Sequence, residues 1–159
     1  MKAWLILFIG CLLYGAAAIA SAEGPEELEL QRPVKAPIWR GFGLHFHPVL
    51  RKSQMNLGVS FAIQARTPVY AAAEGRVREI NRTLTRGLYV VIEHKRGYET
   101  VYAHLAQIVV EPGQRVSVGS IIGYVGAEGT NTGNTTHLLR FELHRRGNAI
   151  DPEPYFRKG

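Results

Sequence analysis

Cysteine is almost absent from this sequence, since Cys11 is the only one among 159 residues. A single thiol cannot build a disulfide framework or a cysteine-ligated zinc fold, so the chain must be stabilised by its hydrophobic core. Sustained helical periodicity, internal repeats and low-complexity tracts are missing as well. Hydrophobic residues make up 46% of the chain and charged residues 20%, which is typical of a globular domain and excludes a disordered one.

Acidic residues are fewer than basic residues. The chain has 19 Lys and Arg against 13 Asp and Glu, which gives a formal net charge of +6. Such a surface suits a polyanionic neighbour: nucleic acid, anionic lipid head groups or an acidic wall polymer. We expect no nucleic acid partner, because the basic residues are dispersed and the beginning of the chain indicates export.

Residues 1–22 have the pattern of a secretory signal peptide. Lys2 precedes an apolar run, and Ala20-Ser21-Ala22 is a small-x-small cleavage signature. We expect cleavage before Glu23, an exported chain in the periplasm or cell envelope, and no stable membrane span after cleavage. Two anchored alternatives stay open: an uncleaved leader, whose apolar run of about 18 residues is at the lower limit for a span, or lipid on Cys11.

The rest of the chain divides into a lead-in and one domain. Residues 23–38 are polar and contain prolines, which predicts an extended linker. Residues 39–157 show short β-branched and aromatic runs between glycine turns, which predicts an all-β antiparallel sheet or sandwich. The expected strands are 58–63, 75–81, 88–94, 99–104, 121–125 and 138–145.

Several motifs follow one another in this domain. They are Gly41-Phe42-Gly43 with His47-Pro48, Thr67 to Val77, Tyr89 to His94, Tyr102-Ala103-His104-Leu105, Phe141-Glu142 and Asp151-Pro152. From Gly41 to Phe156, this order resembles the lysostaphin-type (LytM-like) zinc peptidoglycan endopeptidases. The resemblance implies the fold of that family, a compact antiparallel β-sheet or sandwich (the duplicated hybrid motif) with a groove across one face.

The resemblance also implies where zinc ligands would be. The family holds zinc with the His and Asp of H-x-G-x-D and the second His of H-x-H, and a histidine in Y-A-H-L assists. Here Asn56 and Ser60 occupy the first pair, and Leu138 and Arg140 occupy H-x-H. An amide, a hydroxyl and a guanidinium cannot replace these ligands, and a fixed cation repels a dication. We therefore expect no metal and no cofactor, with a vestigial groove formed by Asn56, Ser60, Leu138, Arg140 and Glu142 beside the retained His104.

A second interpretation keeps the metal. The chain has extra residues before Phe141 relative to the family, and an alignment that places this gap elsewhere puts His137 at the second His of H-x-H. His144, His45 and His47 offer further imidazoles. Such displaced ligands would make the chain a zinc metalloendopeptidase that cleaves peptidoglycan cross-links. Each histidine also has a structural interpretation, for example His144 on a solvated basic edge beside Arg145.

The family implies a role for a domain without ligands. Exported relatives of this kind activate the amidases that split daughter-cell walls, and their C-terminal strand resembles residues 139–152. The chain is therefore interpreted as a non-catalytic binder or regulator, with peptidoglycan or a peptidoglycan hydrolase as partner, although it lacks the long coiled coil of those activators. A structural subunit of an envelope complex is the other alternative. Arg140 would suit a partner carboxylate, or would form an internal ion pair with Glu142 or Glu74.

Overall fold

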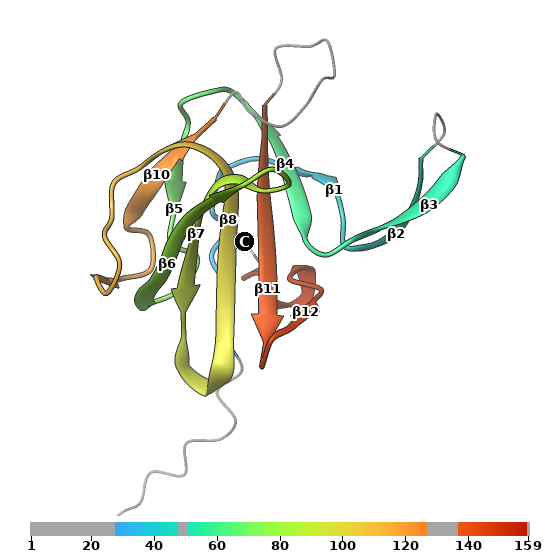
Figure 1. The fold of residues 1–159 in the computed structure, drawn as a ribbon. Helices are drawn as coiled ribbons and strands as arrows, with labels where there is room; N and C mark the ends of the chain where they lie inside the picture. Colours follow the sequence, from blue (N-terminus) through green and yellow to red (C-terminus); the bar gives the residue numbers. More distant parts are fainter. Residues whose placement is uncertain (1–27, 48–50, 127–136, 159) are drawn as a thin grey trace, which may run out of the picture.

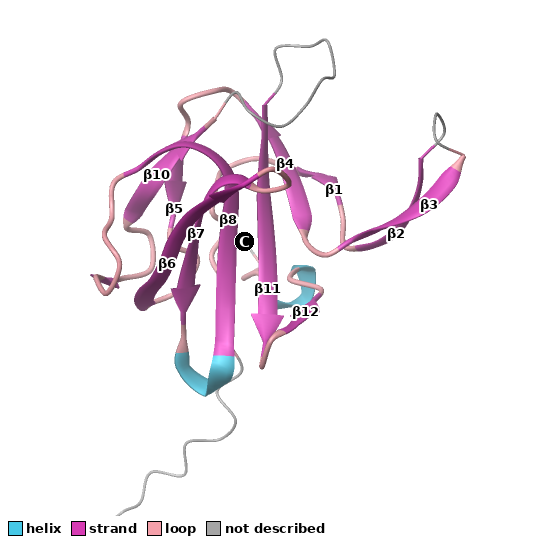
Figure 2. Cartoon of the chain, in the orientation of Figure 1, coloured by secondary structure: helices cyan, strands magenta, loops and turns pink. Residues whose placement is uncertain are grey.

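The computed structural model describes residues 28–47, 51–126 and 137–158, so the expected signal peptide and Cys11 lie outside the described residues. The described chain is built of β-strands and two short 3-10 turns, 95–97 and 153–155 (Figure 2). No helix in this part is both long and apolar enough to cross a membrane. The strands are β1 (Ile38–Arg40), β2 (Gly43–His47), β3 (Lys52–Asn56), β4 (Val59–Ile63), β5 (Pro68–Tyr70), β6 (Gly75–Thr83), β7 (Gly87–Glu93), β8 (Tyr98–Ile108), β9 (Arg115–Val116), β10 (Ile121–Val125), β11 (His137–Arg145) and β12 (Asn148–Ile150).

One antiparallel sheet organises the domain. Its strand order is β1-β4-β11-β8-β7-β6-β9, with β10 joined to β8 and β5, and β12 joined to β11. The strands β2 and β3 form a separate two-stranded sheet that projects away from the rest (Figure 1). The all-β prediction and all six expected strands are confirmed, while the strands of that separate hairpin and the short strands β1, β5, β9 and β12 were not expected.

The hydrophobic core fills one side of the main sheet. The side chains of Tyr102, Phe61 and Phe141 are fully buried there, and the rings of Tyr102 and Phe141 meet edge to face with centroids 5.2 Å apart. The Tyr102 hydroxyl accepts hydrogen bonds from the backbone N–H of Ala72 at 2.8 Å and the hydroxyl of Thr100 at 3.1 Å. Burial raises the pKa of Tyr102 to about 12, so this phenol stays neutral at physiological pH.

Residues 28–37, within the segment expected to be an extended linker, are packed onto the domain and bend at residues 33–36. Leu30 and Val34 are buried in the core, and Leu30 forms a parallel bridge with Phe156. The backbone N–H of Leu30 donates to the carbonyl of Tyr155 at 2.7 Å, and the N–H of Arg157 donates to the carbonyl of Leu30 at 2.9 Å. The packed chain therefore includes residues well before 39, because two apolar side chains in a polar segment fill space in the core.

The opposite face of the sheet is only partly apolar. Tyr89 and Val91 from β7 pack there with Val101 and Ala103 from β8, apart from the main core. In the register of β11 and β8, Glu142 lies beside Val101, and Arg140 beside Ala103. Because side chains on a strand alternate between faces, these two charged residues belong to this face.

A close approach of backbones supports this face from the β3–β4 turn. An added Cβ at Gly58 would lie 2.3 Å from the carbonyl oxygen of Phe141 and 2.8 Å from Cγ of Glu142.

We expect Gly58→Ala to lower the free energy of unfolding by about 1–3 kcal/mol, as overpacking does. Urea titrations measure this difference. The control is Gly41→Ala, whose Cβ would meet only the flexible Glu153 carboxylate. Equal losses in both variants would contradict the close-approach explanation.

Candidate functional site

The structure brings five of the predicted site residues to the partly apolar face: Ser60, His104, Leu138, Arg140 and Glu142. Arg140 on β11 pairs in register with Ser60 on β4 and with Ala103 on β8, directly before His104. Asn56 ends β3 close by, and its side-chain amide donates to the carbonyl of Gly41 at 2.7 Å. Leu138 lies two residues before Arg140 on the same face of β11 and is half-buried.

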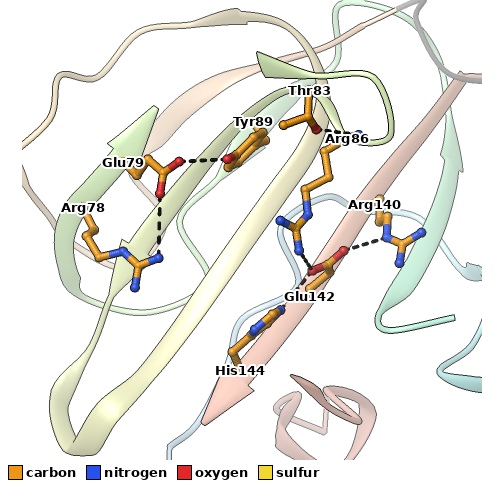
Figure 3. A network of polar contacts seen from close by, with 8 residues as sticks. All are labelled: Arg78, Glu79, Thr83, Arg86, Tyr89, Arg140, Glu142 and His144. Atoms are coloured by element: carbon orange, nitrogen blue, oxygen red, sulfur yellow. Dashed lines mark hydrogen bonds and ion pairs between the residues drawn. The ribbon is translucent and has the colours of Figure 1, made fainter. Parts of the chain in front are cut away.

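A carboxylate surrounded by basic groups is the centre of this face. The side chain of Glu142 is 2% exposed. Its Oε1 accepts a hydrogen bond from Nε of Arg140 at 2.8 Å, and its Oε2 accepts one from Nη2 of Arg86 at 2.8 Å. Nε2 of His144 lies 2.9 Å from the same Oε2 (Figure 3). Two guanidinium groups therefore share one carboxylate, and the cluster carries an excess of positive charge.

The pKa of Glu142 reflects this cluster. Burial alone would raise it, but hydrogen bonds from His144 and Arg86, together with the charges of Arg86 and Arg140, lower it to about 2. Of the two internal partners expected for Arg140, the structure selects Glu142, while Glu74 pairs with Lys95 at 3.1 Å.

Arg86 is the residue of this site that sequence reasoning missed. It lies in the turn between β6 and β7, where its backbone N–H donates to the hydroxyl of Thr83 at 3.1 Å. Its guanidinium stacks over the ring of Tyr89 at 5.5 Å and reaches Glu142 across 56 residues of sequence. No local pattern signals a contact at that separation, since only the pairing of β7 with β8 and of β8 with β11 brings the turn to the site.

His104 has an unusual backbone for a residue with a side chain. Its φ is +64°, and its N–H donates to the carbonyl of Arg86 at 2.8 Å while its carbonyl accepts from Gly126 at 2.9 Å. Its Nδ1 is buried without a hydrogen-bond partner among the described residues. Burial and the charge of Arg140 lower its pKa, against a smaller opposing effect of Glu142, so the ring is neutral at pH 7. Strained conformations of this kind cluster at functional sites.

The residues at the implied zinc positions do not fit a zinc ion. Zinc sites use thiolate, imidazole and carboxylate donors. Asn56 directs its N–H₂ to a carbonyl, Ser60 offers a hydroxyl, and Arg140 places a guanidinium next to the carboxylate of Glu142. Across residues 28–47, 51–126 and 137–158, no three His, Cys, Asp or Glu side chains are grouped so that they could hold a metal.

The displaced ligands do not come together either. His137 and His144 lie seven residues apart on β11, which separates them by about 23 Å and puts them on opposite faces. His45 contacts the carbonyl of Gly41 through Nε2 at 2.9 Å on the separate hairpin, and His47 ends β2 opposite Lys52. The expectation of His144 on a solvated edge is wrong, because its side chain is 16% exposed and contacts Glu142.

A second polar network lies farther along the same sheet. The hydroxyl of Tyr89 donates to Oε1 of Glu79 at 2.8 Å, and Arg78 contacts Glu79 (Figure 3). Arg78 also pairs with Glu99. The hydrogen bond from Tyr89 lowers the pKa of Glu79, with a further contribution from Asn81. This network fixes Tyr89, the ring on which Arg86 rests, and so supports the Glu142 cluster from the side.

A cavity of about 1250 Å³ lies away from this site. It is lined by the turn after β7 and by both ends of the packed chain, among them Leu28, Lys95, Tyr98 and Phe156. Its lining residues include none of the Glu142 cluster. The groove that the resemblance implies across the site therefore stays a prediction.

Known proteins match this chain over most of the domain. The model for "Peptidase family M23" matches residues 54–152. Peptidoglycan DD-endopeptidase ShyA of Vibrio cholerae is 39% identical over 105 residues, which are 66% of this chain and 24% of that protein. Murein hydrolase activator EnvC of Escherichia coli is 33% identical over 123 residues, which are 77% of this chain and 28% of that protein. The chain thus spans about a quarter of the length of the curated relatives it matches.

Solved structures agree with the fold. A zinc-containing peptidase from Vibrio cholerae superposes with a TM-score of 0.70 at 35% identity, over 79% of this chain and 39% of that one. The catalytic domain of lysostaphin from Staphylococcus simulans superposes with a TM-score of 0.64 at 26% identity, over 76% of this chain and 91% of that one. The lysostaphin-type fold predicted from the sequence is confirmed, and the chain belongs to Peptidase family M23.

Proposed function

We propose that this chain is an exported, non-catalytic member of the family that binds or regulates at the bacterial cell wall. One observation carries the proposal. Arg140, which the resemblance places on a zinc-ligand position, forms a 2.8 Å ion pair with the buried carboxylate of Glu142. A guanidinium fixed at that point excludes a dication from the position by repulsion and occupies the space that an imidazole ligand would need.

The same arrangement suits an anionic ligand. Arg140 uses Nε for Glu142, its terminal nitrogens point away from that carboxylate in Figure 3, and its side chain is 28% exposed. A guanidinium offers a planar fork of donors that matches a carboxylate. Ser60 and the neutral His104 add hydrogen-bonding groups beside it. We infer that a carboxylate of a peptidoglycan stem peptide, or of an acidic segment on a wall hydrolase, binds here.

The names of two relatives support a role at the cell wall and a regulatory role, respectively. ShyA is named a peptidoglycan endopeptidase, and EnvC is named an activator of murein hydrolases. This chain shares their domain, and its residues at the implied ligand positions favour the second kind of role over the first. The proposed location in the envelope rests on the leader pattern of residues 1–22.

The proposal predicts a domain without zinc and without peptidase activity. The chain from Glu23 onward, purified and equilibrated with zinc, is expected to retain far less than one zinc per chain in metal analysis. It is also expected to release no peptides from purified peptidoglycan in chromatography of the soluble products. The zinc-containing peptidase from Vibrio cholerae serves as the positive control.

The displaced-ligand alternative makes the opposite prediction. One zinc per chain, with cleavage that disappears in the His137→Ala variant, would replace the proposal by a zinc endopeptidase. Zinc binding without cleavage would remove the argument from Arg140, because that argument excludes the metal itself.

A further inference from the structure

The separate β2–β3 hairpin has one apolar face that the described residues leave exposed. Leu44 pairs in register with Met55, and Phe46 pairs with Ser53 one step farther along. Because side chains alternate along a strand, Leu44, Phe46 and Met55 share one face, and Asn56 belongs to the other. Leu44 is 70% exposed, Phe46 66% and Met55 51%. We call these three residues the apolar hairpin face.

The apolar hairpin face groups three of the nine large apolar side chains that are exposed among the described residues. The two strands form their own sheet and project from the main sheet (Figure 1), so within the described part of the chain no other sheet pairs with them. A two-stranded hairpin alone is only marginally stable in water, and grouped exposed apolar side chains mark interaction surfaces. The chain thus holds three large apolar side chains in water on an element that gains little from them in the free protein.

The charged residues of the hairpin strands, of the turn before β3 and of β1 are all basic, whereas the carboxylate of Glu153 lies beside Gly41 at the base of the hairpin. From Leu30 to Ala73 the sequence contains no Asp or Glu. The hairpin and its base carry Arg40, Arg51 and Lys52, all exposed. Trp39 at the base is 51% exposed, and the Arg40 guanidinium lies 4.7 Å from its ring centroid. An apolar surface on an element whose own charged residues are cations is complementary to a surface that is apolar inside and anionic outside.

We propose that the hairpin docks on an anionic lipid surface, with the apolar hairpin face in the acyl-headgroup boundary and the three basic residues on lipid phosphates. Each Lys or Arg close to an anionic bilayer adds to binding, apolar side chains add in proportion to the area buried, and tryptophan favours this boundary. A lipid surface fits better than a protein partner, because the hairpin projects as a separate two-stranded element. A second copy is disfavoured, since two such hairpins would bring like charges together.

This inference goes beyond the proposed function and uses from it only the location in the envelope. The apolar hairpin face lies on the side of the hairpin opposite Asn56. The Glu142 cluster and the apolar hairpin face can therefore bind their ligands independently. Docking through the hairpin would hold the domain at a leaflet with the Arg140 face still accessible to the wall.

The test uses the chain from Glu23 and vesicles of phosphatidylethanolamine with phosphatidylglycerol, compared with vesicles of phosphatidylcholine alone. Trp39 is the only tryptophan left once the leader with Trp4 is absent. We expect sedimentation with the anionic vesicles and a blue shift of Trp39 emission. Leu44→Ser/Phe46→Ser should lower the partition coefficient at least tenfold, and Arg51→Gln/Lys52→Gln about thirtyfold.

Matched control variants distinguish binding through the hairpin from non-specific adsorption to vesicles. Leu84→Ser removes a fully exposed apolar side chain from the β6–β7 turn, and Arg115→Gln/Lys158→Gln removes two exposed cations elsewhere. Both should bind vesicles like the wild type, and circular dichroism checks that all variants are folded. Equal loss in the charge control would mean that net charge alone drives binding, and so overturn the proposal. Absence of vesicle binding would also overturn the proposal. In that case, a dimer that depends on Leu44 and Phe46 would identify a second copy of the chain as the occupant of the apolar hairpin face. A monomer would identify another protein as its occupant.

Discussion

Glu142→Gln is expected to lower the free energy of unfolding by about 3 kcal/mol at pH 7. The pKa of this carboxyl is lowered from 4.5 to about 2 in the folded protein, and each pKa unit corresponds to about 1.4 kcal/mol. The substitution keeps the shape of the side chain but leaves Arg86 and Arg140 without their anion. Urea titrations of the two proteins measure the difference.

The same carboxylate predicts a pH dependence of known sign. The folded pKa is depressed, so its contribution is complete above pH 4.5 and is lost as the pH falls toward about 2. The wild type should therefore lose more stability than Glu142→Gln across this window, and the two curves should converge near pH 2. Glu79→Gln is the matched control, since its side chain is 38% exposed and should contribute under about 1 kcal/mol. Parallel curves for wild type and Glu142→Gln would show that the cluster does not stabilise the fold.

Arg140→Ala should remove most of the binding to the wall ligand. Truncating one charge of a hydrogen-bonded pair in a desolvated site typically costs about 2 to 5 kcal/mol of binding. We expect this loss in co-sedimentation with purified peptidoglycan, or in capture of a wall hydrolase from envelope extract. Stability should fall less than in Glu142→Gln, because Arg86 and His144 still contact the carboxylate.

Two variants make that experiment interpretable. Arg115→Ala removes an exposed cation on β9, far along the sheet from the site, and should bind like the wild type. His104→Ala removes the neutral ring beside Arg140 and should weaken binding to a smaller extent. If folded wild type, Arg140→Ala and His104→Ala are captured equally, Arg140 is only a structural partner of Glu142, and the binding surface lies elsewhere.

The long strands of the main sheet could be predicted from local sequence. The packing of the N-terminal segment and the separate β2–β3 hairpin could not. β-branched runs between glycine turns indicate a strand wherever a strand has its own pattern, as in β7 and β8. The segment around Leu30 and Val34 has no such pattern, and its burial depends on a gap that only the finished sheet leaves. The β2–β3 hairpin forms a sheet of its own, apart from the strands whose pattern indicated the main sheet.

The site shows the same limit. The resemblance located Ser60, His104 and Arg140, which the register brings together, and it offered Glu142 as one of two partners for Arg140. Arg86 could not be found, because its contact depends on strand order rather than spacing. His144 was misplaced for a related reason: its neighbours Arg145 and Arg146 suggested a solvated edge, while strand parity turns it toward Glu142.

The bridge between Leu30 and Phe156 has a consequence for how the chain folds. The last long strand, β11, lies between β4 and β8, so a chain that emerges N-terminus first leaves the edges of both strands unpaired until residues 137–145 arrive. Pairings between such distant segments form slowly, on a scale of about milliseconds to seconds. Unpaired edges are aggregation-prone in that interval. Because Phe156 must then meet Leu30 to complete the core, the domain can become fully native only after residue 156 has been synthesised.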